Sequence, residues 1–260
     1  METHAHHLHK APGSGWKHYF FEFFMLFLAV FCGFLVENWR EHRVEQERAK
    51  ELALNLYREI ISDSISVQQR ISVRKIKESE CTYFISYVKD SDLVYLSDHF
   101  YPAFSWALIQ TQRIYFEPND GILTQLRNSG ELRYFKSSEL QVAVGKLGVE
   151  VANVRNRNEK EQSFVEMYAR PFSLKYYDFN WFESLTNRGN LELYNALIQN
   201  KKVAVKGKIP NLDKFDRKEA ENVVSYYLLM LRATRMAQYS GYAAINHDLL
   251  QILRKEYSLE

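Results

Sequence analysis

Four closely spaced histidines are the residues of this sequence that are best suited to bind a metal ion. The tail predicted over residues 1–18 contains the run HAHHLHK, which supplies His4, His6, His7 and His9. Neutral imidazoles at this spacing can bind Zn²⁺, Ni²⁺ or Cu²⁺. A defined site also needs fixed geometry and supporting hydrogen bonds, which a tail does not provide. We interpret the histidines as a pH-sensitive tail that binds metal weakly, with a true metal site as the alternative, and predict no cofactor.

Glu22 is the ionisable residue of an otherwise apolar run, residues 19–36. A carboxylate in hydrocarbon is costly, so such residues are candidates for function. Glu22 lies close to the beginning of the run, however, and His18 precedes it by four residues, a spacing that brings two side chains together on a helix. A proton or ion path would need further membrane helices. We therefore predict an interfacial or helix-pairing carboxylate.

Aromatic residues gather at Tyr176, Tyr177, Phe179 and Trp181. Such a cluster can line a ligand or partner surface. Aromatic side chains also dominate ordinary core burial, which favours a loop docked on the rest of the protein. The ligand or partner surface is kept as the alternative.

Common catalytic motifs are missing from the sequence. There is no Walker A loop, GxSxG, HExxH, CxxC or GxGxxG pattern. The formal net charge of +2 gives no reason to expect a nucleic-acid partner. Cys32 and Cys81 cannot build a disulfide scaffold and are interpreted as free thiols. The protein is therefore predicted not to be an enzyme, although an unrecognised type of enzyme is a minor alternative.

The apolar run itself predicts a transmembrane helix. Residues 19–36 read YFFEFFMLFLAVFCGFLV, and at about 1.5 Å per residue they cover roughly 27 Å of a hydrocarbon core that is about 30 Å thick. Trp16 and Lys17 on one side, and Trp39 and Arg40 on the other, are residue types that anchor a span at the membrane interfaces. No small-x-small cleavage site follows the run. We predict an uncleaved, single-pass anchor.

A long helix is predicted to continue as a stalk over residues 37–90. No Gly or Pro occurs between Glu37 and Lys89, and apolar residues recur there with helical period. The members of this stripe are Ala49, Leu52, Leu56, Ile60, Val67 and Ile71. Such a stripe is typical of packing against helices of the same chain, and a homo-oligomeric coiled coil is the alternative.

Residues 91–260 are predicted to form an antiparallel helical bundle that packs with the stalk. The expected helices are residues 102–115, 121–128, 138–170, 191–199 and 216–257. A capping box at Ser138 and Gln141 should begin the long third helix, and Pro171 should end it. Asp216 should cap the last helix, and Gly241 should bend it. The overall prediction is an all-α protein.

Two stretches resemble a family of uncharacterised single-pass membrane proteins of Gram-negative bacteria. The first is METHAHHLHKAPGSGWKHYFFEFFMLFLAVFCGFLVENWREHRVEQ, with a short basic tail, an apolar helix, Asn-Trp followed by Arg-Glu, and a charged helix. The second is GILTQLRNSGELRYFKSSEL, a short helix, Ser-Gly and a capped helix. The family has no assigned activity, so the resemblance implies no catalytic residue. It implies an inner-membrane protein with a cytoplasmic tail and a periplasmic helical domain.

The charge count near the apolar run favours the opposite orientation, because more Lys and Arg follow the run than precede it. Glutamates alternate with these cations, which is also the pattern of a helix with many salt bridges. We follow the resemblance and predict a periplasmic domain.

These observations together predict a membrane-anchored interaction or scaffold protein of the cell envelope. Its expected partners are the lipid bilayer and either another protein or further copies of itself. A ligand-sensing extracytoplasmic domain that signals through a dimer or a partner is the alternative function.

Overall fold

The computed structural model describes residues 16–187, 191–199, 201 and 207–259. Within these ranges the regular elements are helices and no strand occurs, which confirms the predicted all-α class. The first helix, α1, is Trp16–Asp90, and a helical domain follows it. The chain forms two compact units, residues 1–51 and residues 52–260.

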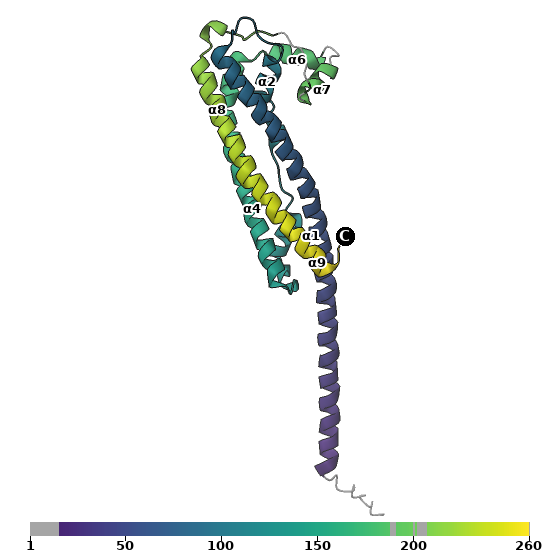
Figure 1. Cartoon of the computed structure of the whole chain (residues 1–260). Coiled ribbons are helices and arrows are strands. Elements are labelled where there is room, and N and C mark those ends of the chain that lie inside the picture. Colours follow the sequence, from purple (N-terminus) through teal and green to yellow (C-terminus); the bar gives the residue numbers. More distant parts are fainter. Residues whose placement is uncertain (1–15, 188–190, 200, 202–206, 260) are drawn as a thin grey trace, which may run out of the picture. The chain divides into compact units, whose positions relative to one another are not determined.

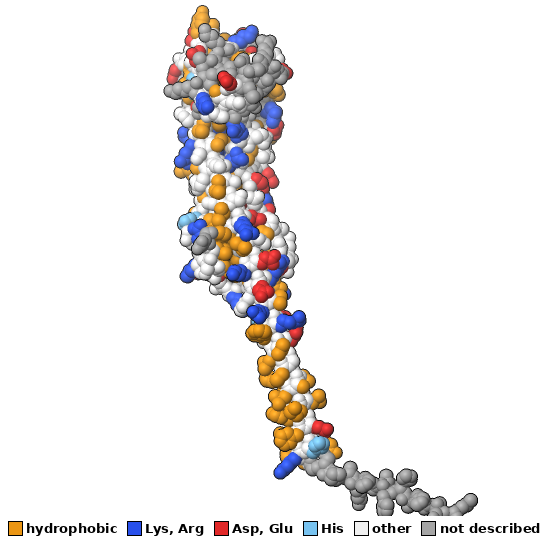
Figure 2. Space-filling view, turned by 90° about the vertical axis from the view of Figure 1, so that its right-hand side faces the viewer, with side chains coloured by type: hydrophobic (Ala, Val, Ile, Leu, Met, Phe, Trp, Pro, Cys, Tyr) orange, Lys and Arg blue, Asp and Glu red, His pale blue; other side chains and the backbone are white. Residues whose placement is uncertain are grey.

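The first unit contains the apolar part of α1. Nearly all its large apolar side chains are exposed, as for Leu26 and Phe34, each 68% exposed, and they cover this stretch of helix in Figure 2. By length and composition, α1 is the one helix among the described residues that can cross a membrane. Charged side chains then pair along the helix, with Arg40 Nη2 2.5 Å from Glu37 Oε1.

The second unit is a bundle built on the remaining part of α1. Figure 1 shows α4 (Ser138–Phe164), α8 (Arg217–Ala233) and α9 (Ser240–Tyr257) lying lengthwise beside it. Hydrogen bonds connect these helices to α1. Asn246 Nδ2 donates to the Ile60 carbonyl at 2.9 Å, and Arg235 Nε donates to Glu78 Oε1 at 2.6 Å.

The long helices of the bundle run in two opposite directions. After α1 the chain returns along it, so that Arg74 Nε donates to the Ile114 carbonyl and the Ile122 N–H donates to Glu59. Because this return is made by short helical segments and extended residues, with no long helix, α4 then runs parallel to α1, whereas α8 and α9 run antiparallel to both (Figure 1).

The remaining elements are short and lie between the long helices. The other α-helices are α2 Phe100–Phe104, α3 Gly121–Asn128, α5 Arg170–Tyr176, α6 Phe179–Asn187 and α7 Leu191–Ile198. The 3₁₀ turns are η2 Gln112–Ile114, η3 Glu131–Tyr134 and η5 Leu212–Lys214. Three segments are π-helical, namely η1 Ser105–Ile109, η4 Val165–Ala169 and η6 Thr234–Tyr239.

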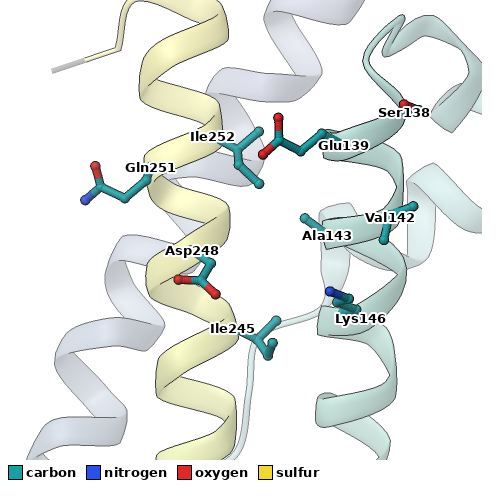
Figure 3. Close-up of a pocket in the computed structure, with 9 residues that line it drawn as sticks. All are labelled: Ser138, Glu139, Val142, Ala143, Lys146, Ile245, Asp248, Gln251 and Ile252. Carbon is teal, nitrogen blue, oxygen red and sulfur yellow. The ribbon is translucent and has the colours of Figure 1, made fainter.

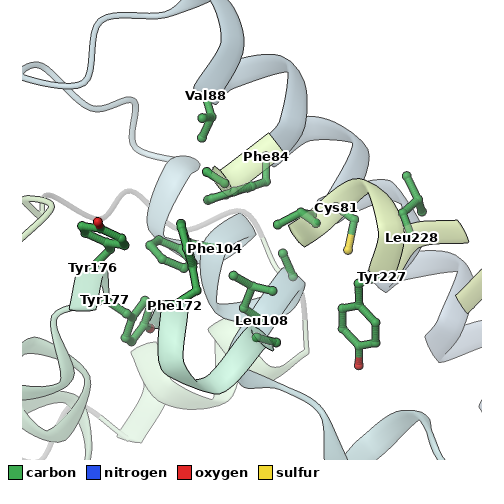
Figure 4. Packing of buried hydrophobic residues seen from close by; sticks show 14 of the residues in the cluster. Cys81, Phe84, Val88, Phe104, Leu108, Phe172, Tyr176, Tyr177, Tyr227 and Leu228 are labelled. Carbon is green, nitrogen blue, oxygen red and sulfur yellow. The ribbon is translucent and has the colours of Figure 1, made fainter. Parts of the chain in front are cut away.

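The predicted stripe on α1 is buried in the second unit. Four members of the stripe in this unit are at most 1% exposed, namely Leu52, Leu56, Ile60 and Val67. This confirms packing against the same chain. Farther along α1, the Phe84 and Phe104 ring centroids are 4.9 Å apart in the core, where Phe172 and Tyr177 join them (Figure 4).

Two predicted helix starts have different outcomes. Asp216 caps α8 as expected, accepting from the Lys218 and Glu219 N–H groups at 2.7 and 3.0 Å. The predicted capping box of α4 is wrong by one residue. Ser137, with an extended backbone, is the cap, and its Oγ accepts from the Leu140 N–H at 3.2 Å. A neighbouring serine with the right spacing produced the error.

Pro171 does not end the helix that contains it, contrary to the prediction. α4 passes through η4 into α5, and Pro171 occupies the first turn of α5. Proline clashes with the carbonyl four residues earlier in a regular α-helix. The wider π turn just before it changes that spacing, so the chain stays helical.

Two further helices also depart from the prediction through π turns. The helix predicted over residues 102–115 changes from α2 to η1 and leaves helical geometry at Gln110. The last helix changes geometry in η6, before Gly241, which lies inside α9. Sequence reasoning placed the irregularity at the glycine because glycine is the usual local signal.

Candidate functional site

The residues predicted near the membrane belong to the first unit, residues 1–51. His4, His6, His7 and His9 fall outside the described residues. The His18 Nε2 and Glu22 Oε1 atoms are 4.0 Å apart, with both side chains exposed. Trp16 and Trp39 are 81% and 64% exposed. Such exposed indoles are suited to a headgroup region.

The predicted aromatic cluster contributes mainly to the core. Tyr176 and Tyr177 are 5% and 2% exposed, and the Tyr176 hydroxyl donates to the Lys214 carbonyl at 2.7 Å. The Trp181 ring packs 4.8 Å from Tyr101, while Phe179 is partly exposed. Burial leaves Tyr176 and Tyr177 almost no surface for a ligand or partner (Figure 4).

A buried salt bridge, which the sequence analysis did not predict, crosses the centre of the bundle. Arg74 Nη2 lies 2.8 Å from Glu161 Oε2 and Nη1 lies 3.1 Å from Oε1, with both side chains fully buried. Thr234 also donates to Glu161, and Arg74 donates to the Tyr239 hydroxyl at 3.2 Å. Burial alone would lower the pKa of Arg74, but the adjacent Glu161 carboxylate raises it overall.

Lys77 lies one turn after Arg74 and is also fully buried. Its ammonium donates to the Trp106 carbonyl at 2.5 Å and to the Gln110 carbonyl at 3.2 Å. The Tyr227 ring lies 5.1 Å from Nζ. Burial lowers the pKa of Lys77 from 10.5 to about 8. We call Arg74, Lys77, Glu161, Thr234 and Tyr239 the buried charge network.

Two of the three π-helical segments meet this network. Lys77 binds the Trp106 carbonyl of η1 and the carbonyl that follows η1, whereas Thr234 and Tyr239 are the first and last residues of η6. Single π turns often mark functional positions. A catalytic lysine or carboxylate must, however, reach a substrate. With Arg74, Lys77 and Glu161 at 0% exposure, the network is suited to fixing the register of the helices.

The pKa of Lys77 predicts a pH dependence of stability. Its folded pKa of about 8 lies below the ordinary 10.5, so the unfolded chain binds this proton more tightly. Below pH 8 both states are protonated, and the cost of the buried charge is present in full. Between the two pKa values the folded amine is neutral, and the free energy of unfolding should rise by about 3 kcal/mol through this group.

Denaturant unfolding of the wild type and of Lys77→Met across this pH window measures the effect. The stability difference should move in favour of the wild type as the pH rises. Burial raises the pKa of Cys81 to about 12, which has the opposite effect, and Lys77 counteracts this shift. Both proteins are therefore compared in a Cys81→Ala background, which removes this contribution. A difference that does not vary with pH would contradict the prediction.

Surface grooves of the second unit are open to solvent. The first lies between α4 and α9, with a volume of about 560 Å³. Its lining is Ser138, Glu139, Val142, Ala143, Lys146, Ile245, Asp248, Gln251 and Ile252. Figure 3 shows Lys146 on α4 and Asp248 on α9 at opposite walls. This mixed lining, with charges of both signs, does not select one class of ligand.

The second groove, about 770 Å³ in volume, lies between α4–η4 and α8 and is more apolar. We call it the α4–α8 groove. Its lining is Asn156, Arg157, Glu159, Lys160, Ser163, Phe164, Met167, Tyr168, Asn222, Val223, Tyr226 and Met230. The Phe164 ring lies at its centre, 5.2 Å from Tyr168 and 5.1 Å from Tyr226. Exposed aromatic and methionine side chains are enriched in protein interfaces, so this is the best candidate docking site.

No protein family model, curated protein or solved structure matches the chain. The candidate sites are therefore interpreted from their own chemistry.

A regular pattern in the sequence marks the position of the buried network. Residues at seven-residue spacing along α1 are all fully buried, and they are Ile60, Val67, Arg74, Cys81 and Val88. An arginine in such an apolar series must be buried with a partner. The α4–α8 groove had no comparable signal, because its walls come from distant parts of the chain.

Proposed function

We propose that the protein is a single-pass membrane protein whose residues 52–260 form a helical interaction domain. The observation that carries the proposal is the exposed apolar surface of α1 over residues 19–36, of which none is buried. Exposing apolar surface to water costs about 25 cal/mol per Å². A bilayer removes this cost, and the exposed Trp16 and Trp39 flank the run at positions suited to its two interfaces.

An interaction role is supported by two features of the domain, its buried charged groups and its exposed apolar groups. The ionisable groups of the buried charge network are closed to substrates, which leaves no catalytic assignment for them. The α4–α8 groove instead exposes Met167, Tyr168 and Tyr226 by 62%, 53% and 54%. Exposed patches of this type mark protein interaction sites. The alternative of a ligand sensor has less support, since Tyr176 and Tyr177 are packed in the core.

We further propose that the membrane is the inner membrane of a Gram-negative bacterium and that the domain is periplasmic. The resemblance of residues 1–46 and 121–140 to single-pass envelope proteins supports this orientation. The excess of Lys and Arg after the apolar run opposes it.

Reporter fusions at the C-terminus test this proposal in cells. A reporter that is active only in the periplasm should give signal, and one that is active only in the cytoplasm should not. The reverse pattern would overturn the orientation but leave the anchor intact. Chemical crosslinking of intact cells, followed by membrane extraction, tests the interaction role. A chain recovered only as an uncrosslinked monomer would contradict it.

A further inference from the structure

We propose that the α4–α8 groove is a self-association site, in which a second copy of this chain inserts the exposed edge of its own α8. This inference rests on the proposed interaction function and names the partner. It is carried by the apolar groove, by an apolar ridge beside it on the same helix, and by a pattern of charge that is complementary to itself.

The groove has a buried floor and exposed walls. Phe164 and Met230 form the floor and are only 8% and 7% exposed. Met167, Tyr168 and Tyr226 rise from α4–η4 and α8 and are more than half exposed. The lining residues follow the two helices over several turns. A groove of this form accepts the apolar face of a helix, as in other helix-in-groove interactions.

The matching ridge lies on the outer side of α8. Leu229 is 63% exposed and follows Tyr226 by three residues. With Asn222 and Ala233, which are also exposed, these two residues have the alternating spacing of four, three and four residues that forms a helix-packing seam. Asn222 and Tyr226 also line the groove, so the ridge includes its α8 wall. The ridge therefore runs parallel to the groove and next to it.

A ridge and a groove side by side are complementary to themselves. A twofold axis parallel to α8, placed between the two features, brings the ridge of each copy into the groove of the other. Isologous contacts of this kind are the commonest in homo-oligomers. In this arrangement the two α8 helices are parallel, and Leu229 of each copy approaches Phe164 and Met230 of the second copy.

The charges at one end of the groove fit this parallel pairing. Glu159 and Lys160 are adjacent and exposed, and among the described residues neither makes an ion pair. The parallel twofold arrangement allows Glu159 of one copy to face Lys160 of the second, and the reverse. At the other end, Lys218 already pairs with Glu221 at 3.0 Å, and Arg170 with Glu166 at 2.6 Å.

The test uses the full chain in detergent, with oligomeric state measured by light scattering over a range of concentrations. The wild type should be dimeric, and Leu229→Glu should weaken the dimer about a hundredfold, since each copy loses one apolar contact and each such loss is worth about tenfold. Ile65→Glu is the matched control, because Ile65 is 58% exposed on α1. It should leave the dimer intact.

A charge exchange tests the pairing and does not depend on the apolar contact. Glu159→Lys should weaken the dimer, because lysines would then face lysines, and the double variant Glu159→Lys with Lys160→Glu should restore it. A monomeric wild type, or a dimer that all these variants leave unchanged, would overturn the proposal. So would a different protein found in the groove by crosslinking from position 229. Membrane fractionation of the same samples shows separately whether the anchor holds.

Discussion

Replacing Arg74 with methionine should lower the free energy of unfolding by about 3–5 kcal/mol. The variant leaves the Glu161 carboxylate fully buried without the two guanidinium contacts, at 2.8 and 3.1 Å, that now compensate its charge. It also removes the donors to the carbonyls of Ile114 and Leu231 and to the Tyr239 hydroxyl. Denaturant unfolding of the full chain in detergent, followed by circular dichroism, measures the loss.

Arg170→Met is the matched control for this substitution. Arg170 pairs with Glu166 at 2.6 Å, a distance as short as those in the buried pair, but both side chains are more than half exposed. Water and salt screen exposed pairs, so the control should lose less than about 1 kcal/mol. If Arg74→Met were no more destabilising than Arg170→Met, burial would not be what makes the network important.

A double variant separates the ion pair from the rest of the network. Arg74→Met combined with Glu161→Leu removes both charges, so it should lose clearly less than the sum of the two single variants. It should not regain wild-type stability, because the Ile114 and Leu231 carbonyls and the Tyr239 hydroxyl each lose the hydrogen bond that Arg74 donates. Strict additivity would contradict direct coupling between the two side chains.

Arginine at both Phe27 and Phe31 should abolish stable membrane association. Each arginine near the centre of a span costs about 2.5–3.5 kcal/mol on insertion scales. Phe27 and Phe31 stack on each other with centroids 5.8 Å apart, so both charges would fall on one face of α1 near the middle of the apolar run. The measurement is the share of the chain that stays in the membrane pellet after an alkaline wash.

Ile65→Arg provides the control for the added charge. Ile65 is an exposed apolar residue of the second unit, so an arginine there should leave the chain in the pellet. If the Phe27 and Phe31 double variant also stayed in the pellet, an anchor formed by residues 19–36 would be ruled out. If both variants left the pellet, the washing conditions rather than the positions of the substitutions would explain their release.

The parts of the fold that the sequence predicted depend on neighbouring residues. The apolar run, the α3 helix, the Asp216 cap and the stripe beginning at Ala49 all follow from patterns within a few turns of chain. Local rules also explain the errors. They place a helix end at Pro171, where the preceding π turn removes the clash, and they place the α4 cap at Ser138, although Ser137 has the extended backbone of a cap.

The buried network and the groove depend on residues that are distant in sequence. Arg74 meets Glu161 across 87 residues, and the two walls of the α4–α8 groove come from helices on either side of a long connection. A sequence shows that Arg74 occupies an apolar series, but it does not show which acid compensates its charge. The topology that makes α4 parallel to α1 determines that partner.

In the π turn η6, the number of residues between Thr234 and Tyr239 is itself important for the structure. These residues are five apart and both reach the Arg74–Glu161 pair, a separation that a regular α-helical turn does not provide. Each residue turns a helix by about 100°, so deleting one here would rotate all of α9 and aim Tyr242 and Asn246 away from α1. Arg235 has a contact of its own, the ion pair with Glu78. Residues 236–238 thus act as a spacer whose count matters more than its composition, and we expect substitutions there to be tolerated better than a deletion.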